Sequence, residues 1–219
     1  MIIPDDLTLC SKFPDSDLLR RLPQQSRSQQ RVTQILEAAA QVFAEVGYEA
    51  ASTSLIATQA KTSVGSLYRF FPDKAAIFQA LGSYCIDQVR ELITKIVNPG
   101  ISHLSINIVT DRIIDAYCDE FLSQPGYRAI LLNANFSPNA RTIIENINWE
   151  IETYFEALFA TRAPEMELDQ RKLIARVSVK TCCVLEFAFS EADDALREKL
   201  RAEGKRLLAA YLQTYFPAP

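Results

Sequence analysis

Apolar residues recur every three or four positions along most of this chain, a spacing that predicts helices rather than strands. The first clear stripe consists of Val32, Ile35, Leu36, Ala39, Val42, Phe43 and Val46. It predicts a helix of about five turns that ends at Gly47. Two short helices are expected next, Ser52 to Ala60 and Val64 to Phe71, each preceded or opened by a serine suited to cap a helix N-terminus.

Proline and glycine divide the rest of the chain into longer helices. Pro72 suits the first position of a helix, and the apolar stripe behind it predicts a helix that runs to about Val97. Five further helices are expected near residues 102–123, 125–135, 138–161, 168–189 and 193–216. The chain has only 6 glycines, so it is predicted to be all-α.

Two short helices joined by a three-residue turn and preceded by a longer helix are the parts of a helix-turn-helix. We therefore predict a flexible arm over residues 1–25, a three-helix DNA-binding domain over residues 26–73, and a larger helical domain over residues 74–219. The charge distribution agrees. The net charge is −4, yet residues 20–74 hold seven lysines and arginines against four acidic residues, as expected of a module that meets phosphates.

The sequence offers little for catalysis or metal binding. The five cysteines lack CxxC or Cys/His spacing, which predicts reduced, mostly buried thiols and no zinc site: Cys10, Cys85, Cys118, Cys182 and Cys183. His103 is the only histidine and is expected at the surface or at a helix cap. With no phosphate loop or GxSxG motif, we expect neither an enzyme nor a cofactor. The absence of a long apolar run predicts a cytoplasmic protein without membrane contact.

The segment from Gly47 to Phe78 resembles the DNA-binding module of the TetR family of bacterial transcriptional regulators. The matching positions are Phe43, Gly47-Tyr48, Ile56-Ala57, Gly65-Ser66-Leu67-Tyr68, Phe70-Phe71 and Lys74. The resemblance covers roughly residues 30 to 80. It implies that Tyr68 and Lys74 bind phosphates, whereas small residues at Gly65 and Ser66 let the recognition helix approach base edges.

The candidate DNA-binding residues are Ser52, Thr53, Lys61, Thr62, Ser63, Val64, Gly65, Ser66, Tyr68, Arg69 and Lys74. Alternatives remain open for several. Tyr68 could fill the edge of the core, Lys61 and Arg69 could be solvated surface, and the two serines at helix starts could act only as caps. Leu67, Phe70 and Phe71 are assigned to the core.

This chain departs from the family pattern in the turn. The family's Ala-Gly-Val-Ser reads Ala60-Lys61-Thr62-Ser63 here. If position 61 is left-handed, Lys61 costs about 1 kcal/mol relative to glycine. Leu55 replaces a charged residue of the family and is expected to be an exposed apolar residue.

For residues 74–219 the resemblance is weaker and implies a ligand-binding and dimerisation domain. Its last two helices would form a homodimer interface through two apolar stripes, although the stripes could instead be monomer core. The stripes are Leu173, Ile174, Val177, Thr181, Val184, Leu185 and Ala188, and Leu196, Leu200, Leu207, Leu208, Tyr211, Leu212 and Tyr215.

The candidate ligand-binding residues are Tyr117, Phe121, Asn135, Phe136, Trp149, Cys182 and Glu186, each of which could also be ordinary core or surface. Their aromatic content predicts a small, mainly hydrophobic effector. The resulting hypothesis is a homodimeric repressor of a pseudo-palindromic DNA site, released by that effector through the helix from Pro72 to Val97. The alternatives are an activator or effector-independent regulator of the same fold, or a helical small-molecule carrier or enzyme.

Overall fold

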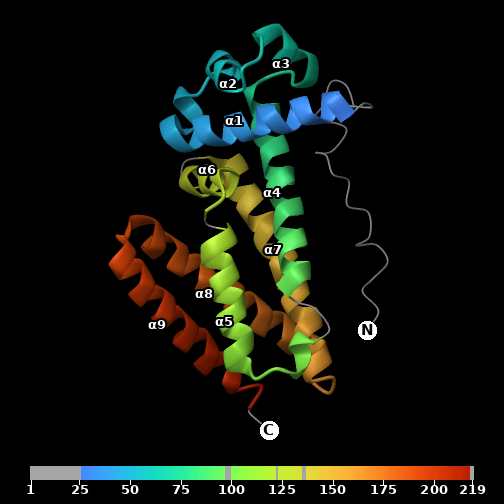
Figure 1. Cartoon of the computed structure of the whole chain (residues 1–219). Helices are drawn as coiled ribbons and strands as arrows, with labels where there is room; N and C mark the ends of the chain where they lie inside the picture. Colours follow the sequence, from blue (N-terminus) through green and yellow to red (C-terminus); the bar gives the residue numbers. More distant parts are fainter. Residues whose placement is uncertain (1–25, 97–99, 122, 135–136, 218–219) are drawn as a thin grey trace. The chain divides into compact units, whose positions relative to one another are not determined.

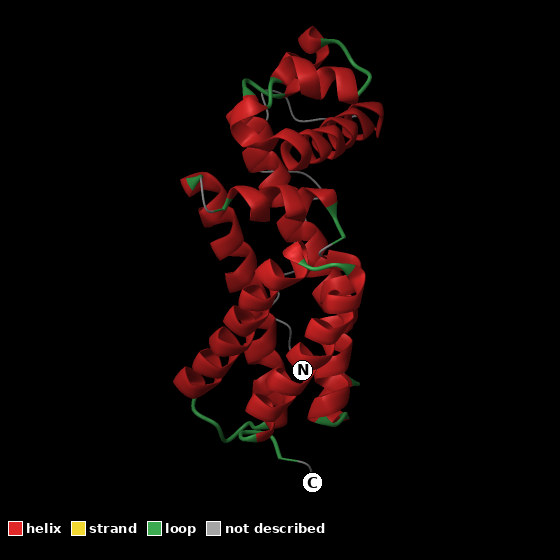
Figure 2. Cartoon of the chain, turned by 90° about the vertical axis from the view of Figure 1, so that its left-hand side faces the viewer, coloured by secondary structure: helices red, strands yellow, loops and turns green. Residues whose placement is uncertain are grey.

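The computed structural model describes residues 26–96, 100–121, 123–134 and 137–217, and these residues form helices joined by short loops, without strands (Figures 1 and 2). The prediction of an all-α chain is confirmed. The helices are α1 (Ser26–Ala50), α2 (Thr53–Gln59), α3 (Val64–Phe70), α4 (Lys74–Ile96), α5 (Ile106–Ala116), α6 (Pro125–Asn133), α7 (Pro138–Arg162), α8 (Leu168–Glu191) and α9 (Asp194–Gln213), with a 3-10 turn, η3 (Ile101–His103), and a π-helical turn, η4 (Tyr117–Phe121). The predicted flexible arm, residues 1–25, lies outside the described residues.

Two predicted helix boundaries were wrong. Pro72 does not begin the fourth helix: Phe71 is extended, as the residue before a proline prefers to be, and Asp73 Oδ1 caps the helix by accepting a hydrogen bond from the Ala76 N–H at 2.8 Å. The single helix expected over residues 102–123 is divided into η3, α5 and η4. Ser105 starts α5 because its Oγ accepts a hydrogen bond from the Ile108 N–H.

The described helices pack as two compact units. One unit comprises α1, α2, α3, most of α4, α6 and the start of α7, within the described residues up to 88 and between 124 and 147. Its core is built on the predicted α1 stripe, with Phe43 against Phe78 at 5.1 Å between ring centroids. Val46, predicted to face inward, is instead exposed, because it ends the stripe just before Gly47 leaves the helical conformation.

Helix α6 packs along α1 within this unit (Figure 1). Its buried face includes Tyr127, Ala129 and Ile130. The sequence-based division after residue 73 follows the elements expected to contact DNA. The two compact units divide the chain differently, because α6 packs along α1.

The second unit comprises the end of α4, η3, α5, η4, most of α7, α8 and α9. Its core holds Phe155, Phe159 and Phe216, and the last two rings stack at 4.9 Å between centroids. Ion pairs join α5 to α9, with Lys205 Nζ 2.7 Å from Asp115 Oδ1. A cavity within this unit is described below.

Candidate nucleic-acid interface and ligand cavity

Helices α2 and α3 begin at serine caps, as the sequence predicts. Ser52 Oγ accepts a hydrogen bond from the Leu55 N–H at 3.2 Å, and Ser63 Oγ accepts one from the Ser66 N–H at 3.1 Å. Each cap satisfies one backbone donor that the first helical turn leaves free. The caps therefore fix where both short helices start, and with them the turn between α2 and α3.

Helix α3 has a buried face and an exposed face. Leu67, Phe70 and Phe71 are buried, which confirms their assignment to the core. The opposite face carries the candidate DNA contacts: Lys61, Ser63, Gly65, Tyr68 and Arg69 are exposed, and Thr62, Val64 and Ser66 are half-buried. The structure thus gathers these residues on one solvent-facing side. Their contact with DNA stays a prediction.

The Tyr68 side chain does not fill the core. It is 39% exposed, and its hydroxyl lies 3.0 Å from Thr53 Oγ1, a hydrogen-bonding distance. Thr53 is the first residue of α2, where backbone N–H groups are free to bind an anion. The two hydroxyls therefore join the start of α2 to α3 in an arrangement suited to a phosphate.

The half-buried Lys74 side chain forms hydrogen bonds within the protein. Its ammonium donates hydrogen bonds to the carbonyl oxygens of Tyr48 at 2.6 Å, Glu49 at 3.2 Å and Ala51 at 3.0 Å, and it stands 4.5 Å from the centroid of the Tyr48 ring. A cation at a helix C-terminus satisfies carbonyls that lack helical partners. Lys74 thus links the start of α4 to the segment that leads into α2, and its predicted phosphate contact would have to coexist with these bonds.

The link between α1 and α2 is also held by α6, which the sequence did not indicate. Gly47 interrupts α1 with φ 77° and ψ 167°, a conformation that favours glycine. Directly after it, the Tyr48 N–H donates a hydrogen bond to Asn133 Oδ1 at 3.0 Å, and Asn133 Nδ2 donates one to the Ala129 carbonyl at 2.7 Å. Asn133 is buried, so these bonds also satisfy a polar group that burial would otherwise penalise.

Lys61 adopts the left-handed conformation, with φ 49°. Leu55, as expected, is an exposed apolar residue.

We predict that Lys61→Gly raises the free energy of unfolding by about 1 kcal/mol, because glycine adopts a positive φ without steric cost. Chemical denaturation measures this change. Lys61→Ala is the matched control: it removes the same charge but keeps the steric cost, so a stabilised alanine variant would contradict the backbone explanation.

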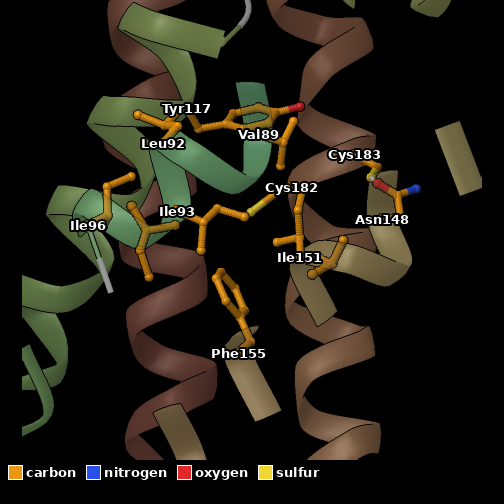
Figure 3. A pocket seen from close by; sticks show the side chains of 12 residues that line it. Val89, Leu92, Ile93, Ile96, Tyr117, Asn148, Ile151, Phe155, Cys182 and Cys183 are labelled. Atoms are coloured by element: carbon orange, nitrogen blue, oxygen red, sulfur yellow. Dashed lines mark hydrogen bonds between the residues drawn. The ribbon is translucent and has the colours of Figure 1, made fainter. Parts of the chain in front are cut away.

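The second unit contains a cavity of about 50 Å³ between α4, α5, η4, α7 and α8 (Figure 3). Its wall is almost entirely apolar. The lining residues are Val89, Leu92, Ile93, Ile96, Ile113, Tyr117, Asn148, Ile151, Phe155, Val179, Cys182 and Cys183. The spacing of apolar residues along the chain does not distinguish the lining of a cavity from a filled core.

Of the predicted ligand-binding residues, Tyr117 and Cys182 line this cavity. Trp149 does not, and it is 63% exposed, because Asn148 and Ile151 occupy the inward face of α7. The side chains of Phe121 and Glu186, and residues 135–136 with Asn135 and Phe136, lie outside the described part of the structure. The cavity therefore brings together two of the seven candidates.

The thiols beside the cavity are protonated at neutral pH. Burial raises the pKa of Cys182 to about 12. Burial also raises the pKa of Cys183, whose Sγ donates a hydrogen bond to Asn148 Oδ1 at 3.3 Å. A protonated, buried thiol is a poor nucleophile. Among the described residues, no group of three or more His, Cys, Asp or Glu side chains is placed to hold a metal ion.

The last two helices present apolar side chains to solvent. Each predicted stripe divides in two: Ile174, Leu208 and Leu212 are buried, whereas the exposed members are Leu173, Val177, Val184, Leu196 and Leu207. The stripes are thus only partly monomer core, and an apolar face remains on α8 and α9.

His103 is exposed, as expected. No helix in the described ranges has the length and hydropathy needed to cross a membrane.

Two family models match the chain. The model described as "Bacterial regulatory proteins, tetR family" matches residues 35–81, and "Tetracyclin repressor-like, C-terminal domain" matches residues 105–212, so together they cover well over half of the sequence. The first match spans α2, α3 and the supporting parts of α1 and α4. The second spans α5 to most of α9.

The curated relatives match over only part of the chain. The A-factor receptor protein of Streptomyces griseus is 43% identical over 60 residues, 27% of this chain and 22% of the relative. An HTH-type transcriptional regulator of Bacillus subtilis strain 168, YuxN, is 35% identical over 66 residues, 30% of this chain and 23% of the relative. The chain thus matches less than a quarter of either relative. The structure of Salmonella enterica GusR aligns with a TM-score of 0.66 at 22% identity, over 86% of this chain and 96% of GusR, which supports the fold.

Proposed function

The chain belongs to the TetR family of bacterial transcriptional regulators, and on that premise we propose that it acts in the cytoplasm as a homodimeric repressor. Each protomer places α3 in one half-site of a pseudo-palindromic operator. A small, mainly hydrophobic effector that occupies the helical bundle lowers the affinity for that operator. Family membership points to a regulator rather than to an enzyme.

The observation that carries the proposal is the amphipathic character of α3, which has one buried face and one exposed face. Buried Leu67 and Phe70 hold the helix in the module, while Gly65 and its polar neighbours face solvent. A recognition helix needs small or hydrogen-bonding side chains that reach base edges, with hydroxyl or cationic groups beside them for phosphates. The exposed face of α3, flanked by Tyr68 and Thr53, supplies both kinds of group.

The exposed apolar face of α8 and α9 supports the homodimer. Several large apolar side chains are exposed on these two helices, and apolar surface gathered in this way marks interaction sites in proteins. A two-fold dimer would bury Val184 and Leu207 against their copies and would present two recognition helices to half-sites about 34 Å apart. One short helix alone reads too few base pairs for a useful specificity.

The cavity favours regulation by an effector over an effector-independent regulator of the same fold. Helix α4 begins with Lys74, which holds the chain entering α2, and its later residues Val89, Leu92 and Ile93 line the cavity. A ligand that displaces the lining residues would act on the same helix. This supports α4 as the element that couples effector binding to DNA affinity.

Selection of bound fragments from the source genome tests the proposal. The purified protein is expected to enrich one pseudo-palindromic motif and to bind it at least a thousandfold more tightly than bulk DNA at the same salt concentration. Enrichment of no motif, with only steeply salt-dependent binding, would favour a helical carrier or enzyme instead. The position of the motif relative to a promoter would separate repressor from activator.

A further inference from the structure

We infer that the effector is a neutral lipophile, held in the cavity of the second unit by dispersion contacts alone, without an ion pair and without a covalent bond to a thiol. The inference rests on the proposed function in that it names the class of molecule the regulator responds to. It is carried by the wall chemistry of the cavity, the state of the charges beside it and the geometry of its thiols.

The described residues of the wall offer no charge to a ligand. Eight of the twelve lining residues are aliphatic or phenylalanine, and the other four are Tyr117, Asn148, Cys182 and Cys183. Figure 3 shows Ile93, Ile151 and Phe155 facing the middle of the cavity, with Asn148 and Cys183 at one side. Moving an ionised group from water into such surroundings costs far more free energy than van der Waals contacts with the wall provide. The wall therefore selects against carboxylates and ammonium groups.

One pair of charged residues next to the cavity lining is already joined in an ion pair. Arg90 follows the lining residue Val89, and Glu150 precedes Ile151. Arg90 Nε lies 2.7 Å from Glu150 Oε1, and the Glu150 side chain is 7% exposed. Removing one partner from a buried ion pair leaves an uncompensated charge, which is strongly unfavourable. A charged ligand could recruit either group only by breaking this pair.

Two polar groups on the wall are engaged with each other. Asn148 Oδ1 accepts the thiol hydrogen of Cys183 at 3.3 Å, so that amide oxygen is partnered by the protein itself. Burial raises the pKa of Cys182 to about 12, so this residue is held as the thiol at pH 7. An electrophile would find almost no nucleophile here, whereas a protonated sulfur is a polarisable, apolar contact.

The volume of the cavity limits how large a part of the ligand can enter before the lining residues move. A dry apolar cavity of about 150 Å³ accommodates benzene. At about 50 Å³, this cavity has room for a short alkyl segment before its lining must move. A six-carbon chain with a small neutral head is therefore a suitable probe, and the same chain with a charged head is its matched control.

The test compares hexan-1-ol, hexanoate and hexylammonium at pH 7 by isothermal titration calorimetry and thermal unfolding of the full chain. Hexan-1-ol is expected to bind and to raise Tm, and the two ions are expected to bind at least tenfold more weakly. Equal or tighter binding of hexanoate or hexylammonium would overturn the inference. So would the absence of any hexan-1-ol binding.

Two variants locate the site. Val179→Phe fills the cavity and should weaken hexan-1-ol binding at least tenfold, whereas Val46→Phe, the same change at an exposed position of α1, should leave it unchanged. If Val179→Phe does not fold, Val89→Ala serves in its place: it enlarges the cavity and should tighten binding of octan-1-ol severalfold relative to the wild type. Unchanged alcohol binding in the folded lining variants would place the ligand elsewhere and refute the inference.

Operator binding separates this inference from the function on which it rests. Selective operator binding without alcohol selectivity would refute only the neutral lipophile. Alcohol binding at this cavity without any sequence-specific DNA binding would retain the site chemistry and refute the regulator. When both hold, saturating hexan-1-ol should lower operator occupancy in the wild type but not in Val179→Phe.

Discussion

Gly65→Leu is expected to reduce operator affinity by about 10- to 100-fold while leaving the protein at least as stable as the wild type. Gly65 is exposed on α3, and a Cβ added there would meet no atom within 4 Å. Leucine is a better helix former than glycine by roughly 0.8 kcal/mol, so the free energy of unfolding should stay constant or rise slightly. On DNA, the same side chain would stand between α3 and the base edges and prevent close approach.

Fluorescence anisotropy with the selected operator, beside urea denaturation, measures both effects. Gln79→Leu is the matched control, because it adds a leucine at an exposed position of α4 without changing net charge. It should keep operator affinity within about twofold. Wild-type affinity in a folded Gly65→Leu protein would show that α3 does not enter a groove at this position.

The helix-turn-helix could be predicted because its signals are local. Serine caps, the spacing of Ile56, Leu67 and Phe70, and the break at Gly47 each depend on neighbours within one or two turns. The start of α4 shows the limit of such signals. Pro72 and Asp73 both suit a helix start, and the extended residue before the proline decides in favour of the aspartate cap.

Features made by distant residues could not be predicted in the same way. Lys74 matches a family position, but only the fold shows its ammonium on three carbonyls near the end of α1. Asn133 is 85 residues from Tyr48 along the chain, and nothing near it in the sequence indicates the hydrogen bond. The cavity is harder still, because Val89, Ile93 and Val179 have the same spacing whether they meet other side chains or empty space.

Val184→Glu is expected to convert the proposed homodimer into monomers and to weaken operator binding more than 100-fold. Val184 is 73% exposed in the single chain and lies on the apolar face that α8 and α9 present. In a two-fold interface the substitution occurs twice, so two carboxylates would be desolvated close to each other without partners. A monomer would bind one half-site and lose the avidity of the pair.

Analytical ultracentrifugation at micromolar concentration and operator titration measure the two effects, and far-UV circular dichroism reports whether the helices persist. Ala157→Glu introduces the same charge at an exposed position of α7 and should remain dimeric with normal operator affinity. The two results together separate a defined interface from a general response to added charge. A Val184→Glu protein that sediments as a dimer would exclude this face of α8 from the interface. Burying two carboxylates without partners would cost more free energy than a dimer held by this face could supply.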